Sequence, residues 1–341
     1  MNPTRNARDL LFYLMALALV FLQYRGWRVG HASNMEYLTT AMDGVLHGTP
    51  HWRAYQNRLL APLIYSALNF VTPQGYVVFV QVSLTALGLS LYGMLKKLGV
   101  DNGPALTALS MAVLLWTLEQ YNSFYLWDLI DAGWMLALVY LSMTDKLKRW
   151  IYVVFAIALL NRESALFVAA SWGFSGLAMW SQDRATAKSR IKQGAVMGLL
   201  VVIFVEAVRK TLFQHSMLTG VWTDDAHKTF ENHIKLIDNI GFIIPQIKAG
   251  SPLVFTLVFY AAILIVATRN AIRSRHADLT GSALALSAYF LSLFVFGAIG
   301  ELRLYQPFVW VLALLLFAGS KPRGTVASQS LPPRRGEAHT V

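Results

Sequence analysis

Apolar segments long enough to approach a membrane crossing recur along almost the whole chain, and this restricts the fold more than any other feature. A helix that crosses the hydrocarbon core of a bilayer needs about 20 predominantly apolar residues. Ten segments approach this length: 9–25, 75–95, 103–119, 126–143, 149–160, 164–180, 193–212, 252–268, 279–298 and 303–320. Backbone groups inside a bilayer must be hydrogen-bonded internally, as they are in helices. We therefore expect an all-α, polytopic integral membrane bundle with about ten transmembrane helices.

The composition agrees with a membrane protein. Hydrophobic residues make up 56% of the chain and charged residues 14%, whereas soluble domains are about a quarter charged. The chain has no cysteine, which excludes disulfides and thiolate metal sites. The net charge of +11 is interpreted as the excess of Lys and Arg found in cytoplasmic loops of membrane proteins, so nucleic acid is not an expected partner.

The basic residues also predict the orientation. Segment 58–72 is apolar but short and contains Pro62, so we interpret it as a re-entrant or interfacial helix. If it does not cross, Lys96, Lys97 and the basic run 146–149 share one side of the membrane with both termini. If it crossed, those residues would move outside. The positive-inside rule therefore places both termini in the cytoplasm.

A single transmembrane domain is expected over residues 1–320, with no separate soluble domain. The first apolar span lacks a small-residue cleavage site and is interpreted as a retained helix. Outer loops are expected at 26–57, which includes an amphipathic stretch at 34–47, and at 213–251. The tail 321–341 is rich in Pro, Ser and Arg and is expected to be disordered and cytoplasmic.

Charged residues gather at the outer ends of the predicted helices, where burial is costly and function is the default explanation. The break Asn161-Arg162-Glu163 is the most informative. The preceding run 149–160 reaches about 18 Å as a helix, and the hydrocarbon core is about 30 Å thick. The break should therefore lie below the membrane surface and line a wet cavity. Arg162 and Glu163 would form an ion pair there, which either serves a substrate or only closes the cavity.

The other charged residues at the outer ends each allow two interpretations. Asp128 and Asp131 share a helical face, and Asp128 either orders the cavity or caps its helix. Glu301 and Arg303 either belong to the site or pair with each other or with lipid head groups. Arginine suits a phosphate because its guanidinium matches phosphate oxygens, and Arg58, Arg162 and Arg303 all fall on the outer side. A carboxylate nearby would act as general base, and a divalent metal (Mg or Mn) is a possible cofactor.

Several short motifs resemble bacterial glycosyltransferases of the GT-C superfamily. They are the stretch from Tyr37 to Gly48, Arg58-Leu-Leu-Ala-Pro62, Asp128-Leu-Ile-Asp131, Arg162-Glu163-Ser-Ala and Glu301-Leu-Arg303-Leu-Tyr-Gln-Pro307. Ser33 and Asn34 stand where that superfamily has an acidic residue, so the resemblance makes Glu36 or Asp43 the catalytic base. Arg58, Arg162 and Arg303 would hold the phosphate, and Asp128, Asp131, Glu163 and Glu301 would order the cavity.

The resemblance implies an inverting glycosyltransferase in the bacterial inner membrane. It would move a sugar from a polyprenyl-phosphate lipid donor to an extracytoplasmic glycan or lipid acceptor, among membrane lipids. Two alternatives stay open: a transporter or flippase for a lipid-linked or anionic substrate, and a non-catalytic membrane assembly protein. A polar cavity open only to the outer leaflet, with Glu36, Arg162 and Arg303 converging in it, would favour the enzyme.

Overall fold

The computed structural model describes residues 3–31, 35–47, 58–119, 125–212, 235–297 and 302–318, and within these ranges the regular structure is entirely helical. Six helices are long and apolar enough to span a membrane: α1 (Pro3–His31), α4 (Gly75–Lys97), α6 (Leu126–Met143), α9 (Arg184–Leu212), α11 (Pro252–Arg273) and α12 (Ala277–Phe296). The prediction of an all-helical fold is therefore confirmed for the described residues, and the six long apolar helices agree with a membrane protein.

The remaining helices are shorter. They are α2 (Met35–Leu46), α3 (Leu60–Val71), α5 (Asn102–Glu119), α7 (Leu147–Asn161), α8 (Leu166–Ala178), α10 (Leu236–Lys248) and α13 (Gln306–Ala318), with 3₁₀ turns η3 (Glu163–Ala165) and η7 (Leu302–Tyr305). Each of the ten predicted apolar segments coincides with a helix. Four of those helices, α5, α7, α8 and α13, are not among the six that meet the length and hydropathy requirement, so the number of ten crossings stays a prediction.

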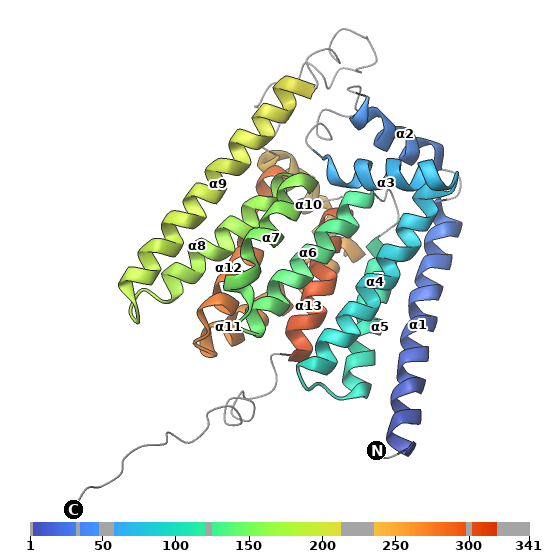
Figure 1. Cartoon of the computed structure of the whole chain (residues 1–341), viewed down its shortest axis with the longest axis horizontal. Coiled ribbons are helices and arrows are strands. Elements are labelled where there is room, and N and C mark those ends of the chain that lie inside the picture. Colours follow the sequence, from blue (N-terminus) through green and yellow to red (C-terminus); the bar gives the residue numbers. More distant parts are fainter. Residues whose placement is uncertain are drawn as a thin grey trace, which may run out of the picture.

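Helix α13 occupies the middle of the bundle and contacts α4, α5, α6 and α11. Its residues from Phe308 to Leu314 are at most 1% exposed, and the segment is apolar on all sides, as expected for a helix buried on all sides. Around it the long helices run side by side between two ends of the molecule (Figure 1). The core is thus a set of packed apolar helices with α13 at its centre.

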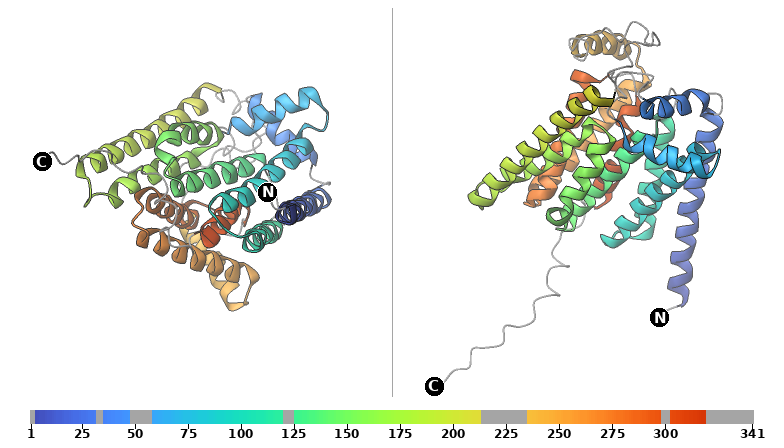
Figure 2. Two further views of the ribbon diagram at one scale, coloured as in Figure 1. Left: turned by 60° about the horizontal axis from the view of Figure 1, so that its bottom comes forward. Right: turned by 45° about the horizontal axis from the view of Figure 1, so that its top comes forward.

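One end of the bundle carries helices that do not run with the others. Helices α2 and α3 lie across this end, opposite to the end where α1 begins (Figures 1 and 2). Helix α2 confirms the predicted amphipathic helix near 34–47, and α3 confirms that 58–72 contains a short helix. With 12 residues, α3 is about 18 Å long, and its position across the bundle supports the interfacial interpretation.

Residues 213–234 of the predicted outer loop 213–251 lie outside the described residues, and part of the remainder is helical. Residues Leu236–Lys248 form α10, a helix of 13 residues that ends shortly before the start of α11. Gly250 has a φ of 63°, a left-handed conformation that glycine adopts without steric cost. This residue makes the turn between the two helices.

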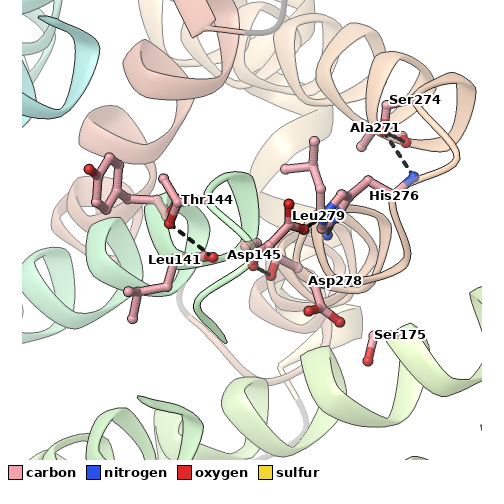
Figure 3. A network of polar contacts seen from close by, with 12 residues as sticks. Leu141, Thr144, Asp145, Ser175, Ala271, Ser274, His276, Asp278 and Leu279 are labelled. Atoms are coloured by element: carbon pink, nitrogen blue, oxygen red, sulfur yellow. Dashed lines mark hydrogen bonds and ion pairs between the residues drawn. The ribbon is translucent and has the colours of Figure 1, made fainter. Parts of the chain in front are cut away.

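The opposite end of the bundle, where α1 begins, is held by a network of polar contacts (Figure 3). Asp145, in the turn after α6, forms an ion pair with His276, which precedes α12. Arg190 of α9 pairs with Asp278 of α12 and donates to the hydroxyl of Ser175 in α8 at 3.0 Å. These contacts join α6, α8, α9 and α12 at the end of the bundle away from Arg162, where helix α7 ends.

Candidate functional site

The predicted break in the apolar run after residue 160 is present. Helix α7 ends at Asn161, Arg162 is fully extended, and η3 leads into α8. Helix α7 has 15 residues, or about 22 Å of helix, which is less than the hydrocarbon thickness of about 30 Å. The amide N–H of Arg162 still donates to the carbonyl of Ala158 at 3.0 Å, so the helix closes normally before the chain turns.

Arg162 is buried, with 4% of its surface exposed, and two aspartates surround its guanidinium. Its Nη1 lies 3.0 Å from Oδ1 of Asp128, its Nε pairs with Oδ2 of Asp131, and its Nη2 donates to the hydroxyl of Tyr289 at 3.3 Å. Both aspartates are fully buried. A buried charge is tolerated when it is paired and hydrogen-bonded, and this arrangement meets that requirement.

Asp131 is the centre of this cluster. Besides pairing with Arg162, its Oδ1 accepts hydrogen bonds from Nε1 of Trp134 at 2.7 Å, Nδ2 of Asn161 at 2.7 Å and Oγ of Ser164 at 3.0 Å. The same Asn161 amide also donates to the carbonyl of Trp127 at 2.8 Å. Asp131 therefore binds side chains from both sides of the chain break and fastens the break to α6.

Tyr289 extends the cluster to two further helices. Its hydroxyl donates to the carbonyl of Leu304 in η7 at 3.1 Å, and its ring stacks on Phe308 of α13 with 4.9 Å between centroids. Phe167 of α8 packs edge-on against the same ring at 4.4 Å. The break at Arg162 is thus held by α6, α12 and α13 together.

A second arginine reaches the same place from a distant part of the chain. The amide of Leu59 donates to the carbonyl of Leu160 at 3.1 Å, which docks the start of α3 on the end of α7. Arg58 is 7% exposed, and its Cζ lies 4.8 Å from the ring centroid of Trp127, a cation–π distance. Its Nη2 is 3.9 Å from Oε1 of Glu163, whose side chain is 46% exposed.

The structure therefore brings five of the predicted site residues together: Arg58, Asp128, Asp131, Arg162 and Glu163. Their pairing bears on two of the alternatives that the sequence left open. Arg162 uses its Nε, Nη1 and Nη2 on Asp131, Asp128 and Tyr289, which favours a structural role over phosphate binding. Asp128 is not the N-cap of α6, because that position belongs to Tyr125.

The two candidate bases lie on α2. Glu36 and Asp43 are exposed, and the carbonyl of Glu36 accepts hydrogen bonds from the hydroxyls of Thr39 and Thr40. Partial burial raises the pKa of the Asp43 carboxyl, and the nearby His47 opposes this effect. Asp43 also acts electrostatically on Tyr65 of α3, so this carboxylate faces the helix that begins after Arg58.

Two further predicted site residues, Glu301 and Arg303, lie in the segment before α13. Glu301 lies outside the described residues. Arg303 belongs to η7, next to the Leu304 carbonyl that binds Tyr289. Within the described ranges no group of three His, Asp or Glu side chains is arranged to hold a metal ion.

Sequence reasoning missed Tyr289 and the indole of Trp134. Trp134 follows Asp131 by three residues, so the helical spacing contained a usable signal. Tyr289 stands inside the apolar run of α12 without a charged neighbour that would single it out. Comparison with protein-family models, curated proteins and solved structures gives no match. The assignment of this site therefore rests on its own geometry and chemistry.

Proposed function

We propose that the chain is a GT-C-like membrane glycosyltransferase that transfers a sugar from a polyprenyl-phosphate donor to an acceptor hydroxyl. The acceptor would be an extracytoplasmic glycan or lipid. A carboxylate takes the acceptor proton, the acceptor oxygen attacks the anomeric carbon, and the bond from that carbon to the phosphate oxygen breaks. The lipid phosphate leaves with the bonding electrons, and the configuration at the sugar inverts.

The main support for the proposal is that two arginines at one end of the bundle, Arg162 and Arg58, have different surroundings. Arg162 is enclosed by two buried aspartates, which attach the segment between α7 and α8 to α6. Arg58 lies beside the Arg162 cluster. Its Nη2 is 3.9 Å from Oε1 of the half-exposed Glu163, which is a long ion pair. A phosphate accepts short, charge-assisted hydrogen bonds from a guanidinium. Arg58 lies beside a carboxylate that is half-exposed, whereas the two aspartates around Arg162 are fully buried. Arg58 is therefore the proposed phosphate-binding residue.

Asp43 is the proposed base, with Glu36 as the alternative on the same helix. A general base works best when its pKa is near the working pH, and burial shifts the pKa of Asp43 in that direction. Glu163 lies close to Arg58, where it would orient the guanidinium before the donor binds.

An apolar groove supports a lipid-linked donor. It has a volume of about 270 Å³ and lies between α4 and α6. Its lining includes Leu129 and Ile130, which stand between the two aspartates of the Arg162 cluster, and continues along the membrane-spanning part of α6 to Ala137. An isoprenoid tail in this groove would leave its phosphate near the end that carries Arg58.

The orientation belongs to the same proposal. Under the positive-inside rule the basic residues favour cytoplasmic termini, and the end with α2, α3 and the Arg162 cluster would then face outward. This matches a donor that presents its sugar on the outer side of a bacterial inner membrane.

A transfer assay with purified, reconstituted protein tests the proposal. Polyprenyl-phosphate hexose and pentose, radiolabelled in the sugar, would be incubated with cell-envelope glycan as acceptor. We expect Asp43→Asn to reduce transfer by a hundredfold or more, a typical contribution of a general base. Glu36→Gln is the matched control on the same helix and should keep transfer near the wild-type rate.

Loss of transfer in Glu36→Gln with retention in Asp43→Asn would support the enzymatic activity but assign the role of general base to Glu36. Wild-type protein that releases no sugar from either donor, or full turnover in both variants, would contradict the proposal.

A further inference from the structure

Helix α10 is attached at both of its ends to the ends of membrane-spanning helices. Its first turn is bound to α12: the amide of Lys235 donates to the carbonyl of Val295 at 2.7 Å. The side-chain amide of Asn239 donates to the carbonyls of Phe294 and Gly297 at 2.8 and 2.7 Å. Its last residue, Lys248, is separated from the start of α11 by three residues. Helix α10 is therefore confined to the level at which α12 ends and α11 begins.

The figures show the same placement. Helix α10 lies at the end of the bundle that also carries α2 and α3, and it runs across that end (Figures 1 and 2). Because α11 and α12 are both long and apolar enough to span the membrane, their shared end marks a membrane surface. The helix thus lies where hydrocarbon gives way to head groups.

The side chains of α10 divide into three faces. Asn239, Ile243 and Gln246 are its least exposed residues between Leu236 and Lys248, and their spacing of four and three places them on one face toward α12. A second face is apolar and open: Leu236, Ile237, Ile240, Ile244 and Ile247 are between 41% and 83% exposed. On a helix of 3.6 residues per turn these five residues fall within a sector of about 100°.

The third face is mixed. Asp238 lies on the far side from Ile240, and its side chain is 73% exposed. The same face carries Gly241, Pro245 and Phe242, which is 42% exposed, while Lys248 lies at the border of the apolar sector, next to Ile237. A five-residue apolar sector open to its surroundings, with a charged residue at its border and another on the opposite face, is typical of helices that lie in the plane of a membrane interface. The adjoining surface of α11 has the same character, since Phe255 and Val258 are 69% and 61% exposed.

We propose that α10 is an interfacial membrane anchor, whose apolar sector enters the boundary between head groups and acyl chains of the leaflet at this end of the bundle. The occupant of the sector is lipid. The sector continues the lipid-facing surface of α11, and the attachments to α11 and α12 hold it at the required depth. This inference does not depend on the proposed enzymatic activity.

Spin labels test the proposal directly because the chain contains no cysteine, so a single introduced cysteine is labelled without background. The full-length protein would carry a nitroxide at Ile240→Cys or, as the matched position on the opposite face, at Asp238→Cys. Phe255→Cys on α11 serves as the lipid reference. The protein would be reconstituted in phosphatidylcholine and phosphatidylglycerol vesicles, and collisions with oxygen and with a water-soluble nickel chelate would be measured.

We expect the ratio of oxygen to nickel collisions at Ile240 to approach that at Phe255 and to exceed that at Asp238 several-fold. Equal ratios at Ile240 and Asp238, both with frequent nickel collisions, would overturn the proposal, since the sector would then face water. Spin–spin broadening at Ile240 that disappears on dilution with unlabelled protein would also overturn it, because a second copy of the chain would then cover the sector.

Discussion

At the scale of single residues, the Arg162 cluster shows how a charge is accommodated inside an apolar bundle. The ionisable side chains of Asp128, Asp131 and Arg162 lie within a few ångströms of one another and are at most 4% exposed. Desolvation of each costs several kcal/mol even after relaxation, and only close pairing and additional hydrogen bonds compensate for it. Asp131 meets this condition with three hydrogen-bond donors in addition to Arg162.

Asp131→Asn should therefore destabilise the protein by about 3 kcal/mol or more, because removing one partner leaves the other buried charge incompletely compensated. Asp238→Asn on α10 is the control. That aspartate pairs with Lys235 at 3.8 Å on an exposed surface, where an ion pair contributes less than about 1 kcal/mol. Thermal unfolding in detergent would show a large decrease of the midpoint for the first variant only. Equal midpoints would mean that the cluster does not hold the break.

At the scale of elements, α8, α9 and α12 approach closely through small residues. A Cβ at Gly194 of α9 would lie 2.8 Å from the carbonyl oxygen of Ala169, and one at Gly281 of α12 would lie 2.4 Å from the carbonyl oxygen of Ser171. Small residues permit such backbone contact between helices in membranes. The contact positions the end of α8 that follows the chain break.

Gly194→Ala should lower the unfolding midpoint, because the backbone of α8 would have to move away from the new methyl group. Gly198→Ala, one turn later on the same helix, meets nothing within 4 Å. It should leave the midpoint unchanged or raise it, since alanine is favoured over glycine in helices by up to about 1 kcal/mol. Circular dichroism melts of the two variants would decide this, and a lower midpoint for Gly198→Ala alone would contradict the packing described.

The elements were largely predictable because apolar length is a local signal. The interval 126–143 matches α6 residue for residue, and the break at 161–163 was visible as three polar residues between two apolar runs. Helix α10 was missed because Pro245 and the Gly250-Ser251-Pro252 turn favour a loop. Pairing across the chain was less accessible: Arg58 meets Trp127 and Glu163, contacts that depend on tertiary packing.

At the scale of the whole molecule, polar contacts are concentrated at two ends. One end contains Arg162, Arg58 and their carboxylates, and the other contains the Asp145–His276 and Arg190–Asp278 pairs. The buried apolar helix α13 lies between them (Figure 1). The two ends are therefore chemically distinct sites, and the proposed donor phosphate belongs to the first of them.

Binding of a short-chain polyprenyl phosphate tests this central claim most directly, and native mass spectrometry or thermophoresis would measure it. Arg58→Gln should weaken binding about tenfold or more, as expected when a charge-assisted hydrogen bond worth about 1.5–3 kcal/mol is lost. Arg149→Gln is the matched control, because Arg149 also lies over an indole ring, that of Trp150, at 5.7 Å. Its affinity should equal that of the wild type. Equal weakening in both variants, or no change in Arg58→Gln, would contradict the assignment of the phosphate site to Arg58.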